Sequence, residues 1–199
     1  MPNQTPFSAK AVQILQGALQ EFLQNGYAGA SMDKVAARAK VSKPTVYSHF
    51  QDKEGLFQAL VKYVAQEHCQ RVTGVTLLQG APEVVLRQSA MVMLSSIVQD
   101  AEYLDFVRLV VGESGRFPVL AQTFLENLTC PCLEQLTEYL KSHSELDIPD
   151  PDATARVLLG SVVFFAMTQG LLHGEKVLPM APERLVDSLM YLLLRQQQG

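Results

Sequence analysis

The chain has 199 residues, of which 48% are hydrophobic and 18% charged, and its net charge is −4. This balance is typical of a globular protein with a buried core, and it excludes a disordered or fibrous chain. The first ten residues, MPNQTPFSAK, are polar and lack the apolar segment of an export signal, so we expect a cytoplasmic protein. Three cysteines do not make a disulfide framework, which agrees with a reducing compartment.

Charge is distributed unevenly along the chain. Residues 1 to 66 hold seven Lys and Arg against four Asp and Glu, a balance of +3, whereas residues 67 to 199 hold nine against sixteen, a balance of −7. Only the first third is therefore suited to a polyanion such as nucleic acid. We expect two domains, residues 1–66 and residues 67–199.

Apolar residues recur at a spacing of about 3.6 along the whole chain, and no long stretch alternates with period two, so the sequence predicts an all-α protein. The first helix ends at Asn25 and Gly26, which are typical of a left-handed helix terminus. Ser31 is the predicted N-cap of a second helix, residues 32 to 39. The apolar stripe of the first helix consists of Val12, Leu15, Leu19, Phe22 and Leu23.

A third helix is predicted directly after the second. Ser42 is its N-cap candidate, and Pro44 fits its first turn, where a missing N–H costs little. A fourth helix is predicted from Asp52 to about Arg71. Two short helices joined by a tight turn and supported by neighbouring helices indicate a helix-turn-helix.

The third helix is predicted to present a polar face. If Val46 and Phe50 face inward together with Val41, Pro44 and Ser48 point outward at about 100° per residue. Such a surface can donate hydrogen bonds to phosphates and read base edges in a major groove. A solvated polar face is the alternative explanation. The residues beside this face are Lys43, Thr45, Tyr47, His49 and Lys53.

The remaining chain is predicted to form five further helices, which makes about nine in total. The longest uncharged run, residues 157 to 174, contains Ser161, Thr168, Gln169 and His173, so a buried helix explains it better than a membrane span. The five predicted helices cover residues 84 to 98, 103 to 111, 118 to 140, 151 to 173 and 182 to 195.

The stretch SMDKVAARAKVSKPTVYSHFQDKEGLF resembles the DNA-binding domain of the tetracycline-repressor (TetR) family, and the match extends over roughly residues 8 to 66. The resemblance implies that four residues reach base edges, namely Lys43, Pro44, Thr45 and Ser48. It also implies that four residues hold phosphates, namely Ser31, Tyr47, His49 and Lys53. A local capping role is the alternative for His49. Lys40 departs from the family, which usually has glycine there, so either lysine tolerates a strained turn or the turn relaxes.

Residues 107 to 124, VRLVVGESGRFPVLAQTF, resemble the C-terminal domain of a TetR subgroup that includes efflux regulators. This resemblance supports the architecture and not a ligand. A small-molecule pocket is expected among helices five to eight, where aromatic and sulfur residues concentrate, because such pockets are mostly apolar. Ordinary core packing is the alternative for each aromatic or sulfur residue. The ligand-binding candidates are Met91, Phe106, Phe124, Phe164 and His173.

Catalytic motifs are missing from the sequence. There is no HExxH, GxSxG, Walker loop or GxGxxG, and the four histidines are scattered, so we expect neither an enzyme nor a metal or organic cofactor. Cys130 and Cys132 flank Pro131, which is expected to kink a helix. Thiols two apart on a helix point away from each other, so we expect buried, unreactive cysteines, with a redox sensor as the alternative.

These observations predict a homodimeric transcriptional regulator, most simply a repressor that a small apolar or amphipathic effector releases from a palindromic operator in double-stranded DNA. No membrane partner is expected. The alternatives are a ligand-independent DNA-bound adaptor that recruits a protein, and an enzyme with a DNA-targeting domain. Dimerisation is expected because one recognition helix covers too few base pairs. The expected interface residues, near the chain end, are Phe165, Leu185, Leu189 and Leu192.

Overall fold

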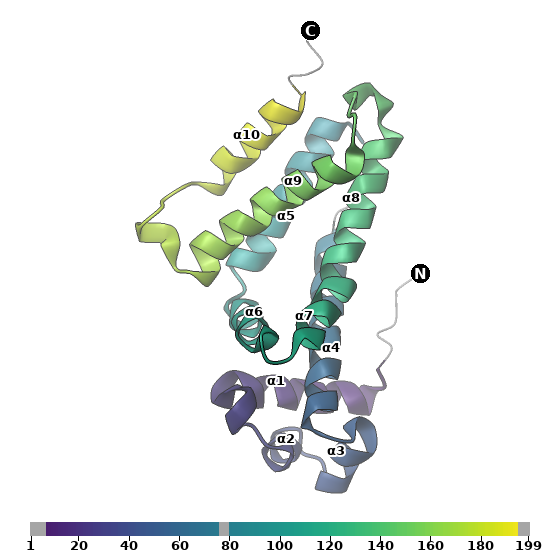
Figure 1. Ribbon diagram of the computed structural model, residues 1–199, viewed down its shortest axis with the longest axis vertical. Coiled ribbons are helices and arrows are strands. Elements are labelled where there is room, and N and C mark those ends of the chain that lie inside the picture. The colour runs from purple at the N-terminus through teal and green to yellow at the C-terminus, as the bar shows by residue number, and fades with distance from the viewer. Residues whose placement is uncertain (1–6, 76–79, 195–199) are drawn as a thin grey trace. The chain divides into compact units, whose positions relative to one another are not determined.

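The computed structural model describes residues 7–75 and 80–194, and every regular element within these residues is helical (Figure 1). The predicted all-α class is confirmed. Because α7, a π-helical segment and α8 follow one another without a break, the described residues form nine long helical runs. The helices are α1 Ala9–Gly29, α2 Met32–Arg38, α3 Lys43–Phe50, α4 Lys53–Val75, α5 Pro82–Val98, α6 Ala101–Ser114, α7 Pro118–Phe124, α8 Cys130–Ser142, α9 Pro151–Ala166 and α10 Pro182–Leu194. Shorter π and 3₁₀ segments cover Leu125–Thr129, Ser144–Leu146, Met167–Leu171 and Gly174–Lys176.

Contacts divide the chain into two compact units. Unit 1 comprises Met1–His68 and Asp105–Leu128, and unit 2 comprises Cys69–Leu104 and Thr129–Gly199. Helix α4 therefore contributes its first part to unit 1 and its last turns to unit 2. The domain division between residues 66 and 67 stays a prediction.

Helix α1 continues one turn beyond its predicted end. Gly26 does adopt the left-handed φ of 66° that the sequence suggested, but the helix resumes and ends at Gly29. The N–H of Ala30 then donates to the carbonyl of Gly26 at 3.2 Å and closes this last turn. At the other end, Ser8 Oγ accepts from the N–H of Ala11 at 3.2 Å, as an N-cap does.

The turn between α2 and α3 retains its tight geometry although it lacks glycine. Helix α2 ends at Arg38, and Lys40 adopts a left-handed φ of 52°, so the lysine tolerates the strained turn rather than relaxing it. The predicted N-caps are present: Ser31 Oγ accepts from Lys34 N, and Ser42 Oγ accepts from Thr45 N, both at 3.3 Å.

Gly17 allows α1 and the end of α2 to approach closely, since a Cβ there would lie 2.8 Å from the backbone nitrogen of Ala39. We expect Gly17→Ala to lower the free energy of unfolding by about 1 to 3 kcal/mol, because the backbone of Ala39 must move. Gly29→Ala is the control, because its Cβ meets only Asn25 Cβ at 3.6 Å. Denaturant unfolding of both variants is the measurement, and equal stabilities would contradict the proposed close packing.

The core of unit 2 consists of faces of α5, α8, α9 and α10. It contains the buried residues Val85, Leu86, Leu94, Tyr139, Leu140, Leu146, Ala155, Val162, Phe165, Val186, Leu189 and Met190. Among the described residues, one helical stretch, Pro151–Leu171, is long and apolar enough to span a membrane, with a mean hydropathy of 1.3. Only 44% of that window is buried, so this stretch has one face in the core and one apolar face outside it.

The helix predicted over residues 118 to 140 is continuous but changes from α-helical to π-helical geometry before its proline. Pro131 has no N–H for the carbonyl four residues earlier, and the chain accommodates this with the π-helical segment Leu125–Thr129. Pro131 then lies in the first turn of α8. The expectation of two buried cysteines is wrong for Cys130, which is exposed, whereas Cys132 is buried.

Candidate DNA-binding surface and ligand cavity

Helix α3 exposes the side chains that the sequence assigned to its outer face. Val46 and Phe50 are buried, as predicted. Lys43, Pro44, Ser48 and His49 are exposed, Tyr47 is 41% exposed, and Thr45 and Ser31 are half-buried. The burial pattern therefore follows the predicted orientation, while the DNA contacts of these residues stay predictions.

Hydroxyl groups on α3 are held by local hydrogen bonds. The hydroxyls of Ser42 and Thr45 lie 2.7 Å apart, and Ser48 Oγ donates to the carbonyl of Thr45 at 2.9 Å. These bonds limit the rotamers of Thr45 and Ser48 and orient them on the exposed face. Each hydroxyl oxygen keeps acceptor capacity for a further partner.

Lys43 is paired with an acidic residue at the start of α2. Its Nζ lies 2.8 Å from Asp33 Oδ1 and 5.9 Å from the ring centre of Tyr47. The hydrogen bond to Asp33 and its negative charge raise the pKa of Lys43 above its ordinary value. A DNA phosphate or guanine that binds this ammonium must therefore compete with Asp33.

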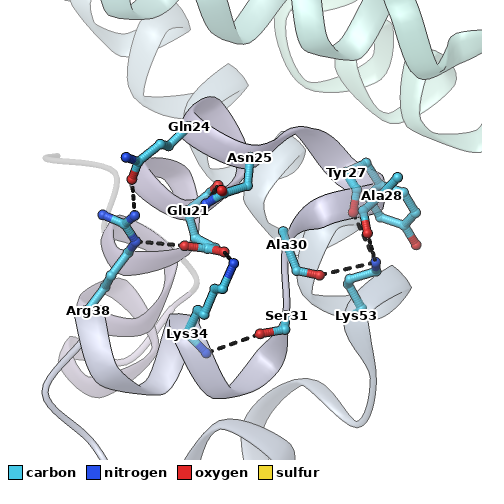
Figure 2. A network of polar contacts seen from close by, with 10 residues as sticks. All are labelled: Glu21, Gln24, Asn25, Tyr27, Ala28, Ala30, Ser31, Lys34, Arg38 and Lys53. Atoms are coloured by element: carbon cyan, nitrogen blue, oxygen red, sulfur yellow. Dashed lines mark hydrogen bonds and ion pairs between the residues drawn. The ribbon is translucent and has the colours of Figure 1, made fainter.

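Lys53 has a set of internal partners that the sequence did not predict. Its Nζ donates to the carbonyls of Tyr27, Ala28 and Ala30, at 2.9, 3.4 and 3.3 Å, and lies 4.6 Å from the ring centre of Tyr27 (Figure 2). The ammonium thus satisfies carbonyls at the end of α1, a position where cations are favourable. Its predicted phosphate contact stays a prediction, since all three ammonium protons have protein acceptors here.

An acidic residue that sequence analysis missed connects α1 to α2. Glu21 is fully buried, and its Oε2 accepts from Arg38 Nε at 2.8 Å, while Lys34 Nζ lies 3.8 Å from Oε1 (Figure 2). The guanidinium of Arg38 also bonds Gln24 Oε1. We call Glu21, Lys34 and Arg38 the helix brace. The available signal was that Glu21 lies in register with the apolar stripe of α1, where Ile14 and Ala18 are buried.

Aromatic contacts join the end of α1 to a segment from the middle of the chain within unit 1. The ring centres of Tyr27 and Phe117 are 4.8 Å apart in an edge-on arrangement, and the Arg116 guanidinium lies 5.5 Å from the Phe117 ring centre. Gln66 Nε2 also donates to Asn127 Oδ1 at 3.1 Å. Burial is the main reason that the pKa of Tyr27 is raised, with Glu54 adding to it.

A cavity of about 80 Å³ lies inside unit 2. No charged residue lines it, and its polar groups are the Ser89 hydroxyl, the Gln135 amide and the Cys132 thiol. The lining residues are Val72, Leu86, Ser89, Ala90, Met93, Cys132, Gln135, Leu136, Leu158, Leu159, Val162, Leu189 and Met190. Such a cavity suits an uncharged apolar molecule with one or two hydrogen-bonding groups.

None of the five predicted ligand residues lines this cavity. Phe106 is fully buried and Phe124 half-buried, and both belong to unit 1. Phe164 and His173 are exposed, and Met91 packs against the core of unit 2. The aromatic and sulfur residues chosen from the sequence therefore lie in the core or on the surface and not in the cavity wall. Ligand contacts of these five residues stay predictions.

The predicted dimer residues are divided between core and surface. Phe165 is only 6% exposed and Leu189 is also buried, Leu185 is half-buried, and Leu192 is exposed. Exposed apolar side chains do lie one residue out of phase on α9 and on the π-helical segment after it, and α10 carries others. We call this set the outer face, and it comprises Val157, Val163, Phe164, Met167, Tyr191 and Leu192. Gly160 lies in the same register, and a Cβ there would meet nothing within 4 Å.

A helix-turn-helix with an exposed polar recognition helix, followed by a helical unit with an apolar cavity, defines a DNA-binding regulator. Comparison with known protein families supports this class of protein. Residues 14–60 match the bacterial regulatory proteins of the tetR family, and residues 85–196 match the C-terminal domain of AefR-like transcriptional repressors. The chain belongs to the TetR family of DNA-binding transcriptional regulators, as the resemblance implied.

Two solved structures and one curated relative are also similar to this chain. A TetR-family regulator from Mesorhizobium loti has a TM-score of 0.83 and 28% identity, covering 97% of this chain and 98% of that one. The flavonoid-responsive regulator FrrA has a TM-score of 0.75 and 26% identity, covering 94% and 96%. The repressor AcnR of Corynebacterium diphtheriae is 34% identical over 83 residues, 42% of each chain. Aligned segments span only 27% to 42% of the first three curated relatives' own lengths.

Proposed function

We propose that this regulator is a cytoplasmic repressor that binds a palindromic operator as a homodimer and leaves it when a small apolar effector binds in unit 2. The observation that carries the proposal is the exposed polar face of α3, which begins at the Ser42 N-cap. The helix brace joins the preceding helix, α2, to α1. The match to AefR-like repressors supports the direction of regulation.

In this proposal, one group of residues contacts the bases of the operator and another contacts its phosphates. Lys43, Pro44, Thr45 and Ser48 read base edges in the major groove, and Ser31, Tyr47 and His49 hold the phosphates on either side. Lys53 contributes mainly by fixing the end of α1 through the carbonyls that it binds, close to Ser31 at the start of α2. A direct phosphate contact of Lys53 requires its release from at least one carbonyl.

Replacing Thr45 by alanine, or Ser48 by alanine, is expected to change which operator sequences the protein prefers. Each lost base contact costs about 1 to 3 kcal/mol on the preferred operator and much less on other sequences. Tyr47→Phe is the control, because a lost phosphate contact weakens all sequences alike. Binding-site selection followed by sequencing measures the preference, and an unchanged consensus in both alanine variants would refute the base-reading role.

The effector in this proposal occupies the cavity of unit 2. At about 80 Å³ the cavity is smaller than the 300 Å³ or more of usual ligand pockets, so binding must enlarge it. That enlargement couples ligand binding to a conformer in which two recognition helices no longer match successive major grooves. FrrA responds to flavonoids, and this supports an apolar or aromatic effector here. An adaptor without a ligand would need no such cavity.

Filling the cavity is expected to abolish induction without weakening operator binding. Ala90 lines the cavity and is distant in sequence from the helix-turn-helix, so Ala90→Leu removes ligand space and leaves α3 unchanged. Operator release by candidate effectors, flavonoids first, is measured by fluorescence anisotropy in the wild-type protein and the variant. If the effector releases both proteins equally from DNA, the effector binds elsewhere.

Dimerisation in this proposal uses the outer face of α9 and α10. A second copy that packs the same residues forms a four-helix interface and buries on the order of 2,000 Å². The position of Gly160 supports this, because open space over a glycine lets another helix approach.

A further inference from the structure

A groove of about 540 Å³ lies in unit 2, lined by the end of α9, the segment between α9 and α10 (Figure 1), and the first turn of α10. Its volume falls within the range of about 300 to 1,000 Å³ that is usual for small-molecule sites. The groove shares no lining residue with the cavity of about 80 Å³ in the same unit. A ligand of the groove therefore occupies a site of its own.

Local contacts fix the wall of the groove. Gln169 Nε2 donates to the carbonyl of Leu178 at 2.6 Å, which ties the segment before α10 to the π-helical segment after α9. The N–H of Leu178 donates to the carbonyl of Gly174 at 2.8 Å. Pro179 and Pro182, which line the groove, each have a fixed φ and so remove further conformational freedom. The groove is therefore preformed, as small-molecule sites usually are.

A buried amide in the groove has one polar atom left for a ligand. Gln169 is only 7% exposed, and its Nε2 is occupied by the carbonyl of Leu178. Within the described residues, no protein group donates to Gln169 Oε1. This oxygen is not sealed in the core, so a molecule in the groove can reach it. An amide oxygen with so little access to water favours a ligand that carries an N–H or O–H.

Two opposite charges line the groove without neutralising each other. Glu175, in the 3₁₀ segment before α10, and Arg184, in the first turn of α10, are both exposed. In the part of the chain that the structure describes, neither side chain forms an ion pair. A carboxylate suits the guanidinium of Arg184, and an ammonium suits the carboxylate of Glu175.

We infer that this groove is a binding site for a small zwitterion with an apolar body, the chemistry that an apolar dipeptide represents. The ammonium of the ligand binds Glu175 and Gln169 Oε1, and its carboxylate binds Arg184. Its apolar body packs on Phe165, which is 6% exposed, and on Met180, which is 45% exposed. The inference concerns binding to the groove alone and stands whether or not the cavity takes an effector.

Titration of the full-length protein with L-leucyl-L-phenylalanine tests the site by isothermal titration calorimetry. We expect saturable binding with a dissociation constant of about 1 mM or lower. The N-acetyl and C-terminal amide derivatives each lack one charge, so each is expected to bind at least about tenfold more weakly.

Variants assign each charge of the ligand to its partner. Arg184→Gln is expected to bind the dipeptide at least about tenfold more weakly, and to bind the dipeptide and its amide equally. Glu175→Gln is expected to remove the preference for the dipeptide over its N-acetyl derivative in the same way. Arg156→Gln is the matched control, because Arg156 pairs with Asp152 and does not line the groove. Ala90→Leu fills the separate cavity and is expected to leave dipeptide binding unchanged.

Three results would count against the inference. Absence of saturable binding up to about 10 mM dipeptide would show that the groove is no site for this class of ligand. Equally tight binding of either derivative would overturn the zwitterionic chemistry. Loss of binding in Ala90→Leu, with no change in Arg184→Gln, would place the dipeptide in the cavity instead of the groove.

Discussion

Phe164→Glu is expected to give a monomer that keeps its helices but binds the operator at least about 100-fold more weakly. Phe164 is 66% exposed in the single chain, so the substitution leaves the core of unit 2 intact. In a twofold dimer the change occurs twice and buries two unpaired carboxylates, each at a cost of several kcal/mol. A monomer presents one recognition helix and loses the contacts of the second half-site.

Its neighbour in sequence supplies a matched control. Phe165 is 6% exposed and belongs to the core of unit 2, so Phe165→Glu is expected to unfold this unit instead of separating folded protomers. Analytical ultracentrifugation gives the mass of each variant, circular dichroism gives its helix content, and anisotropy gives its operator affinity. A folded Phe164→Glu dimer at micromolar concentration would exclude the outer face as the interface.

Glu21→Ala is expected to be the most damaging single change in the DNA-binding half, lowering the free energy of unfolding by about 3 to 5 kcal/mol. Glu21 is fully buried, and its removal leaves the partly buried charge of Arg38 without its carboxylate. The helix brace also sets the position of α2 relative to α1, so operator binding is expected to fall in parallel with stability. Chemical denaturation and operator titration measure the two effects.

Lys34→Ala serves as the comparison, because Lys34 is largely exposed and lies 3.8 Å from the same carboxylate. Exposed ion pairs contribute about 0 to 1 kcal/mol, so this variant is expected to remain near the wild-type stability. Similar losses in both variants would mean that general charge balance stabilises the domain and that the buried contact between Glu21 and Arg38 does not.

Local signals allowed much of the DNA-binding half to be predicted. Ser31 and Ser42 are N-caps whose partners lie within three residues, and the inward Val46 and Phe50 follow from helical periodicity alone. These predictions hold because each depends on neighbours in the chain and on no tertiary contact.

Contacts between distant segments could not be predicted in the same way. The α9 stretch is apolar on nearly all sides, so no periodicity shows that Phe165 faces the core and Phe164 faces outward. The long side chain of Lys53 reaches carbonyls at the end of α1 only because the fold brings the two helices together.

The contact between Tyr27 and Phe117 determines which part of this protein can be transplanted into another regulator. A chimera that takes only the helix-turn-helix segment and its flanking helices leaves the Tyr27 ring without Phe117, and Gln66 without Asn127. The transferable module is discontinuous and consists of the N-terminal helices together with residues 105–128. Engineered repressors that exchange DNA specificity should therefore carry both segments from the same parent.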